Sequence, residues 1–244
     1  MKLVVLASGR GSRLNNLTEN IPKCMVNVNG RPIINYLQKS FNLFKEVIVV
    51  TGYRSSRIEK ELGESVKYIR NKKYKTTNMV YSFFNASKNI NQDVVVIYSD
   101  IIVDPKIFIK LLKKNTSTVP LNYNWLENWK QRMNMKEIYN DAEDVTLKGN
   151  KILSIGQKII HSKLPKVQFM GIMKLNYNDF LKLKIFFNKI KKPKIDLTSF
   201  LDLSIKNKII EMGYMKSNFF WTEIDSVNDL KIANKLIKST RTKL

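Results

Sequence analysis

Residues 3–14 read Leu3-Val4-Val5-Leu6-Ala7-Ser8-Gly9-Arg10-Gly11-Ser12-Arg13-Leu14, a short apolar run followed directly by two glycines. The apolar run is shorter than the roughly 7 to 15 residues of a signal-peptide core, and it ends at a glycine and an arginine. Its length and its valines are those of a buried strand. We therefore expect the chain to begin with a core strand that leads into a glycine-rich loop.

Short apolar runs alternate with helical stretches through the first half of the chain. Further strands are predicted at residues 47–51, 66–69 and 94–98, with helix-like periodicity between them. Proline suits the first position of a helix, so we expect one helix from Pro32 to about residue 44 and another from Pro105 to about residue 113. This alternation predicts an α/β fold with a doubly wound, mostly parallel mixed sheet.

The pattern changes near residue 122. From there to about residue 170, polar and aromatic residues surround two short strands at 145–147 and 152–155, joined by a Lys148-Gly149-Asn150 turn. We expect a small β-containing insertion that lies over the sheet. The chain then resumes with a strand and three helices, predicted at residues 169–175, 177–188, 197–206 and 227–238. A length of 244 residues with 43% hydrophobic residues fits a single domain that spans residues 1–244.

The composition predicts a soluble protein with a basic surface. The 43 Lys and Arg residues exceed the 20 Asp and Glu residues, which gives a formal charge of +23. Because the lysines are spread along the chain, we expect mainly solvated charges and no nucleic-acid partner; attraction of small phosphorylated ligands is the alternative. Cys24 is the single cysteine, so no intramolecular disulfide can form and a cytoplasmic location is expected. No stretch reaches roughly 18 uninterrupted apolar residues, so no membrane association is expected.

The glycine-rich loop has the chemistry of a phosphate site. Gly9 and Gly11 let backbone N–H groups approach phosphate oxygens, because glycine lacks a Cβ and tolerates positive φ. The spacing fits neither the Walker loop nor the dinucleotide fingerprint. Two cations follow: Arg13 suits a fork onto the β- and γ-phosphates, and Lys23 suits the α-phosphate, where substitution occurs. Taken alone, these residues also suit a glycine turn flanked by surface cations.

A series of further motifs follows this loop in order. They are Thr18, Pro22-Lys23-Cys24, Thr51-Gly52-Tyr53, Tyr74, Thr77-Asn78-Met79-Val80-Tyr81-Ser82, Tyr98-Ser99-Asp100, residues 125–132, Asp141-Ala142-Glu143, Ile155-Gly156-Gln157-Lys158 and Trp221-Thr222-Glu223-Ile224-Asp225. Together with the loop, the series resembles the sugar-nucleotidyltransferase-like pyrophosphorylases, and most closely the cytidylyltransferases that activate phosphocholine, aminoethylphosphonate and similar compounds. The resemblance extends over nearly the whole chain and implies a Rossmann-like nucleotidyltransferase fold. Ser8 stands where the family usually has a second alanine.

The resemblance implies a nucleotide site. Its residues are Ala7, Ser8, Gly9, Gly11, Ser12, Arg13, Lys23, Thr77, Asn78, Ser82 and Asp100. CTP is the implied triphosphate, although nothing in the residue chemistry excludes UTP. Thr77 suits a simple helix cap equally well. The implied catalytic cations are Lys23, Arg13 and Lys158.

Two aspartates are implied to hold Mg²⁺. Asp100 follows the strand at 94–98, so it should lie at that strand's carboxyl end, where open α/β sheets bind ligands. The resemblance implies that Asp225 joins it, and Mg²⁺ is satisfied by one or two carboxylates together with water and substrate phosphates. For either aspartate alone, a helix cap or turn is the commoner role. Asp229 is predicted in the first turn of the last helix, where an acidic residue favours the helix dipole.

The implied acceptor pocket mixes aromatic, acidic and basic residues, namely Trp125, Arg132, Asp141, Glu143, Lys158, Trp221 and Glu223. Aromatic faces and carboxylates suit an ammonium group, whereas Arg132 suits an anion. Lys158 resembles the family's lysine for the acceptor phosphate. The tryptophans also suit plain packing, and Lys158 also suits the end of a hairpin. The family's Thr-Asp pair reads Thr198-Ser199 here, which leaves phosphocholine, aminoethylphosphonate, a phosphorylated amino-acid amide and a sugar 1-phosphate open.

The implied activity is Mg²⁺-dependent transfer of a nucleoside monophosphate to a small, amine-bearing phosphorylated acceptor, with release of pyrophosphate. Such an acceptor is already anionic and needs no side-chain base, which fits a chain whose one histidine, His161, is expected to be exposed. The product class would be a precursor of cell-surface polysaccharide, and the enzyme a monomer or homodimer. One alternative is a sugar-1-phosphate nucleotidylyltransferase; another is a non-catalytic, basic nucleic-acid-binding protein.

Overall fold

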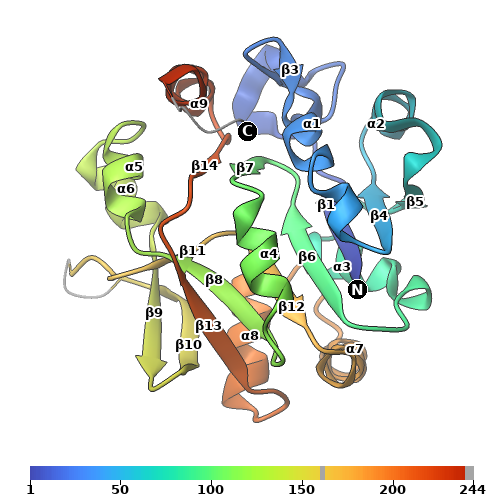
Figure 1. Ribbon diagram of the computed structural model, residues 1–244, viewed down its shortest axis with the longest axis vertical. Helices are drawn as coiled ribbons and strands as arrows, with labels where there is room; N and C mark the ends of the chain where they lie inside the picture. Colours follow the sequence, from blue (N-terminus) through green and yellow to red (C-terminus); the bar gives the residue numbers. More distant parts are fainter. Residues whose placement is uncertain (160–162, 240–244) are drawn as a thin grey trace.

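A mixed β-sheet lies at the centre of the computed structural model, which describes residues 1–159 and 163–239 (Figure 1). Its strands are β1 (Lys2–Ala7), β4 (Glu46–Thr51), β5 (Lys67–Arg70), β6 (Val94–Tyr98), β8 (Thr118–Asn122), β9 (Glu143–Lys148), β10 (Lys151–Lys158), β11 (Gln168–Phe169), β12 (Ile172–Leu175) and β13 (Met212–Ser217). Their order is β5-β4-β1-β6-β12-β8-β13-β10-β9, and β11 pairs with β8. The predicted role of His161 lies outside the described residues.

The sheet divides into a parallel half and a mixed half. β1 pairs in parallel with β4 and β6, and β4 pairs in parallel with β5. β12 then runs antiparallel to β6 and β8, whereas β13 is parallel to β8. The predicted α/β fold with a mixed sheet is thus confirmed. The parallel half ends at β6, so the carboxyl ends of β1 and β6 meet at one edge, where open sheets bind ligands.

Helices cover both faces of the sheet. Because strand side chains alternate, Leu3 and Val5 of β1 enter one core while Val4 and Leu6 enter the other. The first core is covered by α1 (Ile33–Gln38), α2 (Ser55–Leu62), α4 (Lys106–Leu112), α5 (Trp125–Lys130) and α6 (Met135–Asp141). The second is covered by α3 (Met79–Asn85), α7 (Tyr177–Ile190) and α8 (Leu197–Lys206).

A third, smaller core joins segments from both ends of the chain. Its buried residues are Leu14, Val26, Val28, Ile33, Tyr36, Ile102, Ile224 and Ala233. They come from the 3₁₀ turns within Ser12–Thr18, from β2 (Asn27–Val28) and the residue before it, from α1 and β7 (Ile101–Val103), and from α9 (Val227–Ser239) and the residue that follows β14 (Trp221–Glu223). β2 also pairs with β3 (Arg31–Pro32). This core holds the residues after the glycine-rich loop beside the segment that contains Asp225.

Three sequence predictions need correction. The helix after Pro32 ends at Gln38 and not near residue 44, because Phe44 turns into the core against Phe108, 5.6 Å away between ring centroids, and leads into β4. The strand predicted at 169–175 is divided into β11 and β12 around Gly171, whose φ is +71°.

The third correction concerns the insertion. The predicted hairpin exists as β9 and β10, but it pairs with β13 and extends the sheet instead of lying over it. An exposed strand edge has unpaired N–H and C=O groups, and the hairpin covers the start of the β13 edge, where Lys151 pairs with Gly213 and Ile152 with Met212. No helix within the described ranges combines the length and apolar character needed for a membrane crossing.

Candidate active site

Two small elements bring Asp100 and Asp225 together. Asp100 lies in the short turn between β6 and β7, directly before β7, and β7 pairs antiparallel with β14. The N–H of Ile224 donates to the carbonyl of Asp100 at 3.0 Å. Asp225, the next residue, is therefore held beside Asp100 although 125 positions separate the two in the numbering.

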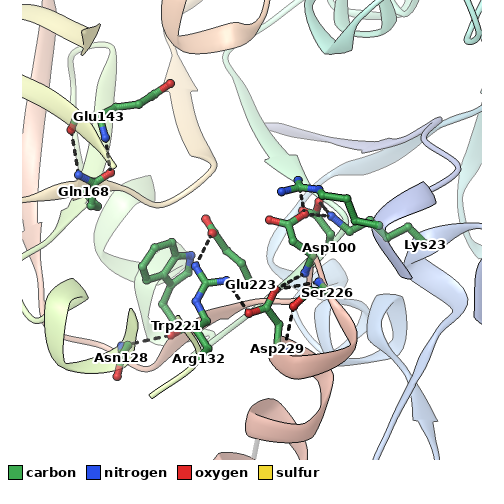
Figure 2. Close-up of polar contacts among 12 residues, drawn as sticks. Lys23, Asp100, Asn128, Arg132, Glu143, Gln168, Trp221, Glu223, Ser226 and Asp229 are labelled. Carbon is green, nitrogen blue, oxygen red and sulfur yellow. Dashed lines mark hydrogen bonds and ion pairs between the residues drawn. The ribbon is translucent and has the colours of Figure 1, made fainter. Parts of the chain in front are cut away.

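The Lys23 side chain bridges the two carboxylates. Its Nζ lies 2.5 Å from Oδ2 of Asp100 and also bonds Oδ1 of Asp225 (Figure 2). The guanidinium of Arg13 contacts the same Asp225 oxygen at 2.9 Å. Burial alone would lower the pKa of Lys23, but the two carboxylates outweigh it and raise this pKa. For Asp225 the signs are reversed: burial alone would raise its pKa, but the positive charges of Lys23 and Arg13 hold this pKa below its ordinary value.

The glycine-rich loop packs directly on the stem of Lys23. Gly11 has a φ of +77°, and a Cβ at this position would lie 2.7 Å from Cβ and 2.8 Å from Cγ of Lys23. The Thr18 hydroxyl, fully buried, donates to the Gly11 carbonyl at 2.9 Å and fixes the loop. Glycine is therefore required here for two reasons: its backbone angle and the closeness of Lys23.

A cleft of about 160 Å³ opens beside Lys23. It is lined by Leu6, Ser8, Gly9, Lys23, Tyr74, Thr77, Asn78, Met79, Ser82, Tyr98, Ser99 and Asp100. Seven of the residues predicted to bind nucleotide are in this lining, and they come from the glycine-rich loop, the turn at Lys23, the start of α3 with the residues before it, and the turn after β6. The other predicted residues lie nearby: Ala7 is buried in β1, Gly11 supports Lys23, Ser12 is exposed and Arg13 faces Asp225.

Asn71 organises the α3 side of this cleft, a role that the sequence did not indicate. It is 1% exposed, and its Nδ2 donates to the hydroxyls of Thr77 at 3.1 Å and Ser82 at 3.0 Å. The cap of α3 is Asn78, whose Oδ1 accepts from the N–H of Met79, and not Thr77. The only available sequence signal was a polar residue immediately after a strand.

Asp225 lines a second, wider cavity of about 590 Å³. Its lining includes the predicted residues Arg13, Arg132, Asp141 and Asp225. Burial raises the pKa of Asp141, with a further contribution from the charge of Asp225.

The guanidinium of Arg132 is already paired with carboxylates. It lies 3.0 Å from Glu223 and 3.2 Å from Asp229, and its Cζ is 4.9 Å from the centre of the Trp129 ring (Figure 2). Burial raises the pKa of Glu223 to about 8 although Arg132 opposes the shift; Asp225 and Asp100 raise it further. Arg132 thus connects the end of α5 to the segment that carries Asp225.

Asp229 anchors the same segment. It lies in the first turn of α9, as predicted, and is 3% exposed. Its Oδ2 accepts from the N–H groups of Asp225 at 3.0 Å and Ser226 at 2.8 Å, while Oδ1 faces Arg132. One carboxylate therefore fixes the backbone at Asp225 and neutralises part of the Arg132 charge.

Glu143 and Lys158 are neighbours on the β9–β10 hairpin, where they occupy paired positions. Glu143 Oε1 accepts from the Thr198 hydroxyl at 3.0 Å, and burial raises its pKa. Gln168, 4% exposed, bonds both the N–H and the carbonyl of Glu143 through its amide (Figure 2). The hairpin thus carries an acidic and a basic residue at paired backbone positions.

The predicted tryptophans lie in the core. Trp125 and Trp221 are each 1% exposed, and Trp125 Nε1 donates to the carbonyl of Pro165 at 3.1 Å. Neither ring is in the lining of the two cavities described above. Their positions correspond to the packing role that the sequence left open.

Comparisons with known proteins agree with this architecture. A family model described as a MobA-like NTP transferase domain matches residues 3–122. The CTP:phosphoglutamine cytidylyltransferase of Campylobacter jejuni is 27% identical over 95% of this chain and 98% of its own length. The choline-phosphate cytidylyltransferase of Streptococcus pneumoniae is 32% identical, over 39% of this chain and 43% of the relative.

Solved structures show the same fold. An inositol-1-phosphate CTP transferase from T. maritima superposes with a TM-score of 0.76 at 20% identity, covering 99% of this chain and 98% of that one. A CTP:phosphocholine cytidylyltransferase from Streptococcus pneumoniae gives a TM-score of 0.72 at 23% identity, covering 97% and 98%. Residues 3–122 thus match the MobA-like NTP transferase domain, and the chain as a whole has the fold of the nucleotidyltransferases to which it is similar.

Proposed function

We propose that this protein transfers CMP from CTP to a small, amine-bearing phosphorylated or phosphonate acceptor and releases pyrophosphate. The observation that carries the proposal is the bridge from Lys23 to Asp100 and Asp225 at the side of the cleft. The choice of CTP is supported by the Campylobacter jejuni relative, whose name specifies CTP and whose length this chain almost completely spans.

The donor set fits Mg²⁺. Asp100 and Asp225 present carboxylate oxygens that a single ammonium group reaches, so they are close enough to share one cation. In residues 1–159 and 163–239, no group of three or more His, Cys, Asp and Glu side chains forms a metal site. Two carboxylates suffice for Mg²⁺ when water and substrate phosphates complete the shell. Bound there, the ion would act as a Lewis acid that neutralises part of the negative charge on the triphosphate oxygens.

The chain's own residues would align the reactants and reduce their repulsion. The N–H groups of the glycine-rich loop and the cations of Arg13 and Lys23 would hold the phosphates. An anionic acceptor oxygen then attacks the α-phosphorus, a new P–O bond forms, and the bond to the β-phosphate breaks with its electron pair leaving on pyrophosphate. Two anions about 4 Å apart repel by roughly 4 kcal/mol at an effective dielectric of 20, which is the scale of help that these cations must give.

Glu143 and Lys158 of the β9–β10 hairpin support an acceptor that carries both a negative phosphate or phosphonate group and a positive ammonium group. Lys158 suits its phosphate or phosphonate group, and Glu143 together with Asp141 suits its ammonium group. The burial of Trp125 and Trp221 shifts this recognition from aromatic faces to carboxylates. A primary amine can donate hydrogen bonds to Glu143, whereas a quaternary ammonium cannot, so primary amines are the preferred acceptors.

The test is pyrophosphate release in the presence of Mg²⁺, with each of four triphosphates against a panel of acceptors. The panel pairs aminoethylphosphonate with ethylphosphonate, and adds phosphocholine, a phosphorylated amino-acid amide and a sugar 1-phosphate. We expect release with CTP and an amine-bearing acceptor, and little with its amine-free partner.

Other outcomes would replace this proposal. Release only with a sugar 1-phosphate would identify a sugar-1-phosphate nucleotidylyltransferase. Absence of release with every pair, together with steeply salt-dependent binding to oligonucleotides, would favour a non-catalytic nucleic-acid-binding protein.

A further inference from the structure

Lys23 is tied to the two aspartates more completely than a phosphate-binding lysine requires. Its Nζ bonds Oδ2 of Asp100 and Oδ1 of Asp225, and its side chain is only 13% exposed. Arg13 adds a second cation at the same Asp225 oxygen. The two negative charges of the aspartates are thus balanced by two positive charges from the chain itself.

This arrangement keeps two like charges together. Carboxylates close enough to share one ammonium would repel each other by several kcal/mol without it, at an effective dielectric near 20. The backbone supports the same placement, because Ile224 bonds the Asp100 carbonyl and Asp229 accepts from the Asp225 N–H. Lys23 therefore does for Asp100 and Asp225 what a bridging metal ion would do.

The same two oxygens cannot hold the ammonium and a divalent cation at once. Mg²⁺ binds carboxylate oxygens at about 2.0–2.1 Å, whereas Nζ lies 2.5 Å from Asp100, so both cations would compete for the same space and repel each other. A lysine released from the carboxylates has an alternative position. Its stem is fixed by Gly11, and its side chain lines the cleft together with Ser8 and Gly9, where triphosphate would bind.

We propose that Lys23 is an internal substitute for the metal ion, which takes its place between Asp100 and Asp225 only as the lysine moves to the phosphates of a bound triphosphate. This inference rests on the proposed function for the identity of the anion that receives the lysine. The inference predicts that metal and triphosphate bind cooperatively. A bound triphosphate draws Lys23 away from the aspartates and so vacates the metal site, and a bound metal ion frees Lys23 for the phosphates. By linkage, the effect is reciprocal.

The test measures binding of Mn²⁺ alone, by calorimetry, to protein without nucleotide or acceptor. Lys23→Met removes the competing ammonium and should bind Mn²⁺ at least about tenfold more tightly than the unsubstituted protein, within the range typical of coupled sites. Lys23→Gln removes the charge but keeps hydrogen-bonding capacity, and it should gain affinity in the same direction. Arg13→Met should gain less, because the Arg13 side chain is 66% exposed.

Two controls locate the effect. Lys158→Met removes another predicted active-site lysine that has no ion pair with Asp100 or Asp225 in the described residues, and its Mn²⁺ affinity should not change. Adding Asp100→Asn to Lys23→Met should abolish the gain, because the ion loses a ligand.

Unchanged or weaker Mn²⁺ binding by both folded Lys23 variants would overturn the inference. The experiment uses no nucleotide, so this failure is distinguishable from failure of the proposed reaction. If the protein releases pyrophosphate but the Lys23 variants bind Mn²⁺ with unchanged affinity, only the inference about Lys23 is refuted. Tighter metal binding without any pyrophosphate release would remove only the proposed reaction.

Discussion

Asp229→Asn should destabilise the protein by about 3 kcal/mol. The carboxylate is 3% exposed, accepts two backbone N–H bonds at 3.0 and 2.8 Å, and lies 3.2 Å from Arg132. An asparagine has one acceptor oxygen, so its NH₂ group must face either the two N–H donors or the guanidinium. Breaking a buried ion pair by removing one partner costs about 3–5 kcal/mol. Arg132 keeps its ion pair with Glu223 in this variant, so we expect a loss of stability at the lower end of that range.

The measurement is urea denaturation at pH 7, with thermal unfolding as a second readout. For a chain of this size, about 3 kcal/mol corresponds to a decrease in Tm of roughly 6–12 °C. The matched control is Asp144→Asn, which removes the same charge from a partly exposed position on β9 with no ion pair in the described residues, and should change stability by less than about 0.5 kcal/mol. Equal stability of the two variants would refute the anchoring role of Asp229.

Three further predictions concern Asp100 and two residues close to Lys23, namely Gly11 and Cys24. Asp100→Asn should lower turnover at least about 10²-fold, the size of an ordinary transition-state contact, in the pyrophosphate assay; a near-normal rate would remove Asp100 from the site. Gly11→Ala should destabilise more than Gly149→Ala in urea denaturation, because both have positive φ but only Gly11 would place a Cβ against Lys23; equal losses would contradict this. Burial, together with the negative charge of Asp100, raises the pKa of the Cys24 thiol to about 12, so the neutral thiol dominates at pH 8. Because the thiolate is the reactive form, iodoacetamide should label Cys24 only when urea has unfolded the protein. Rapid labelling of the native protein would contradict the burial of Cys24.

Much of the fold could be predicted because its signals are local. The strand at β1, the helix at Leu197–Lys206 and the β9–β10 turn each follow from side-chain periodicity or turn residues within one short segment. The length of α1 could not be predicted in this way, since it is set by the packing of Phe44 against Phe108. The edge position of the hairpin depends likewise on an unpaired edge of β13, which follows it in the sequence.

The sequence by itself determined which residues are candidates for the chemistry: the glycines and cations of the first loop, the two aspartates, and the residues of the α3 segment. Tertiary structure decided which of them meet. The pairing of Arg13 with Asp225 spans 212 positions and depends on β7 joining β14. Tertiary structure also assigned Arg132 to Glu223 and Asp229, gave Asn71 its role, and buried the tryptophans. The physical reason is that backbone preference and periodicity act between chain neighbours, whereas ion pairs and burial depend on distances that exist only after the sheet has formed.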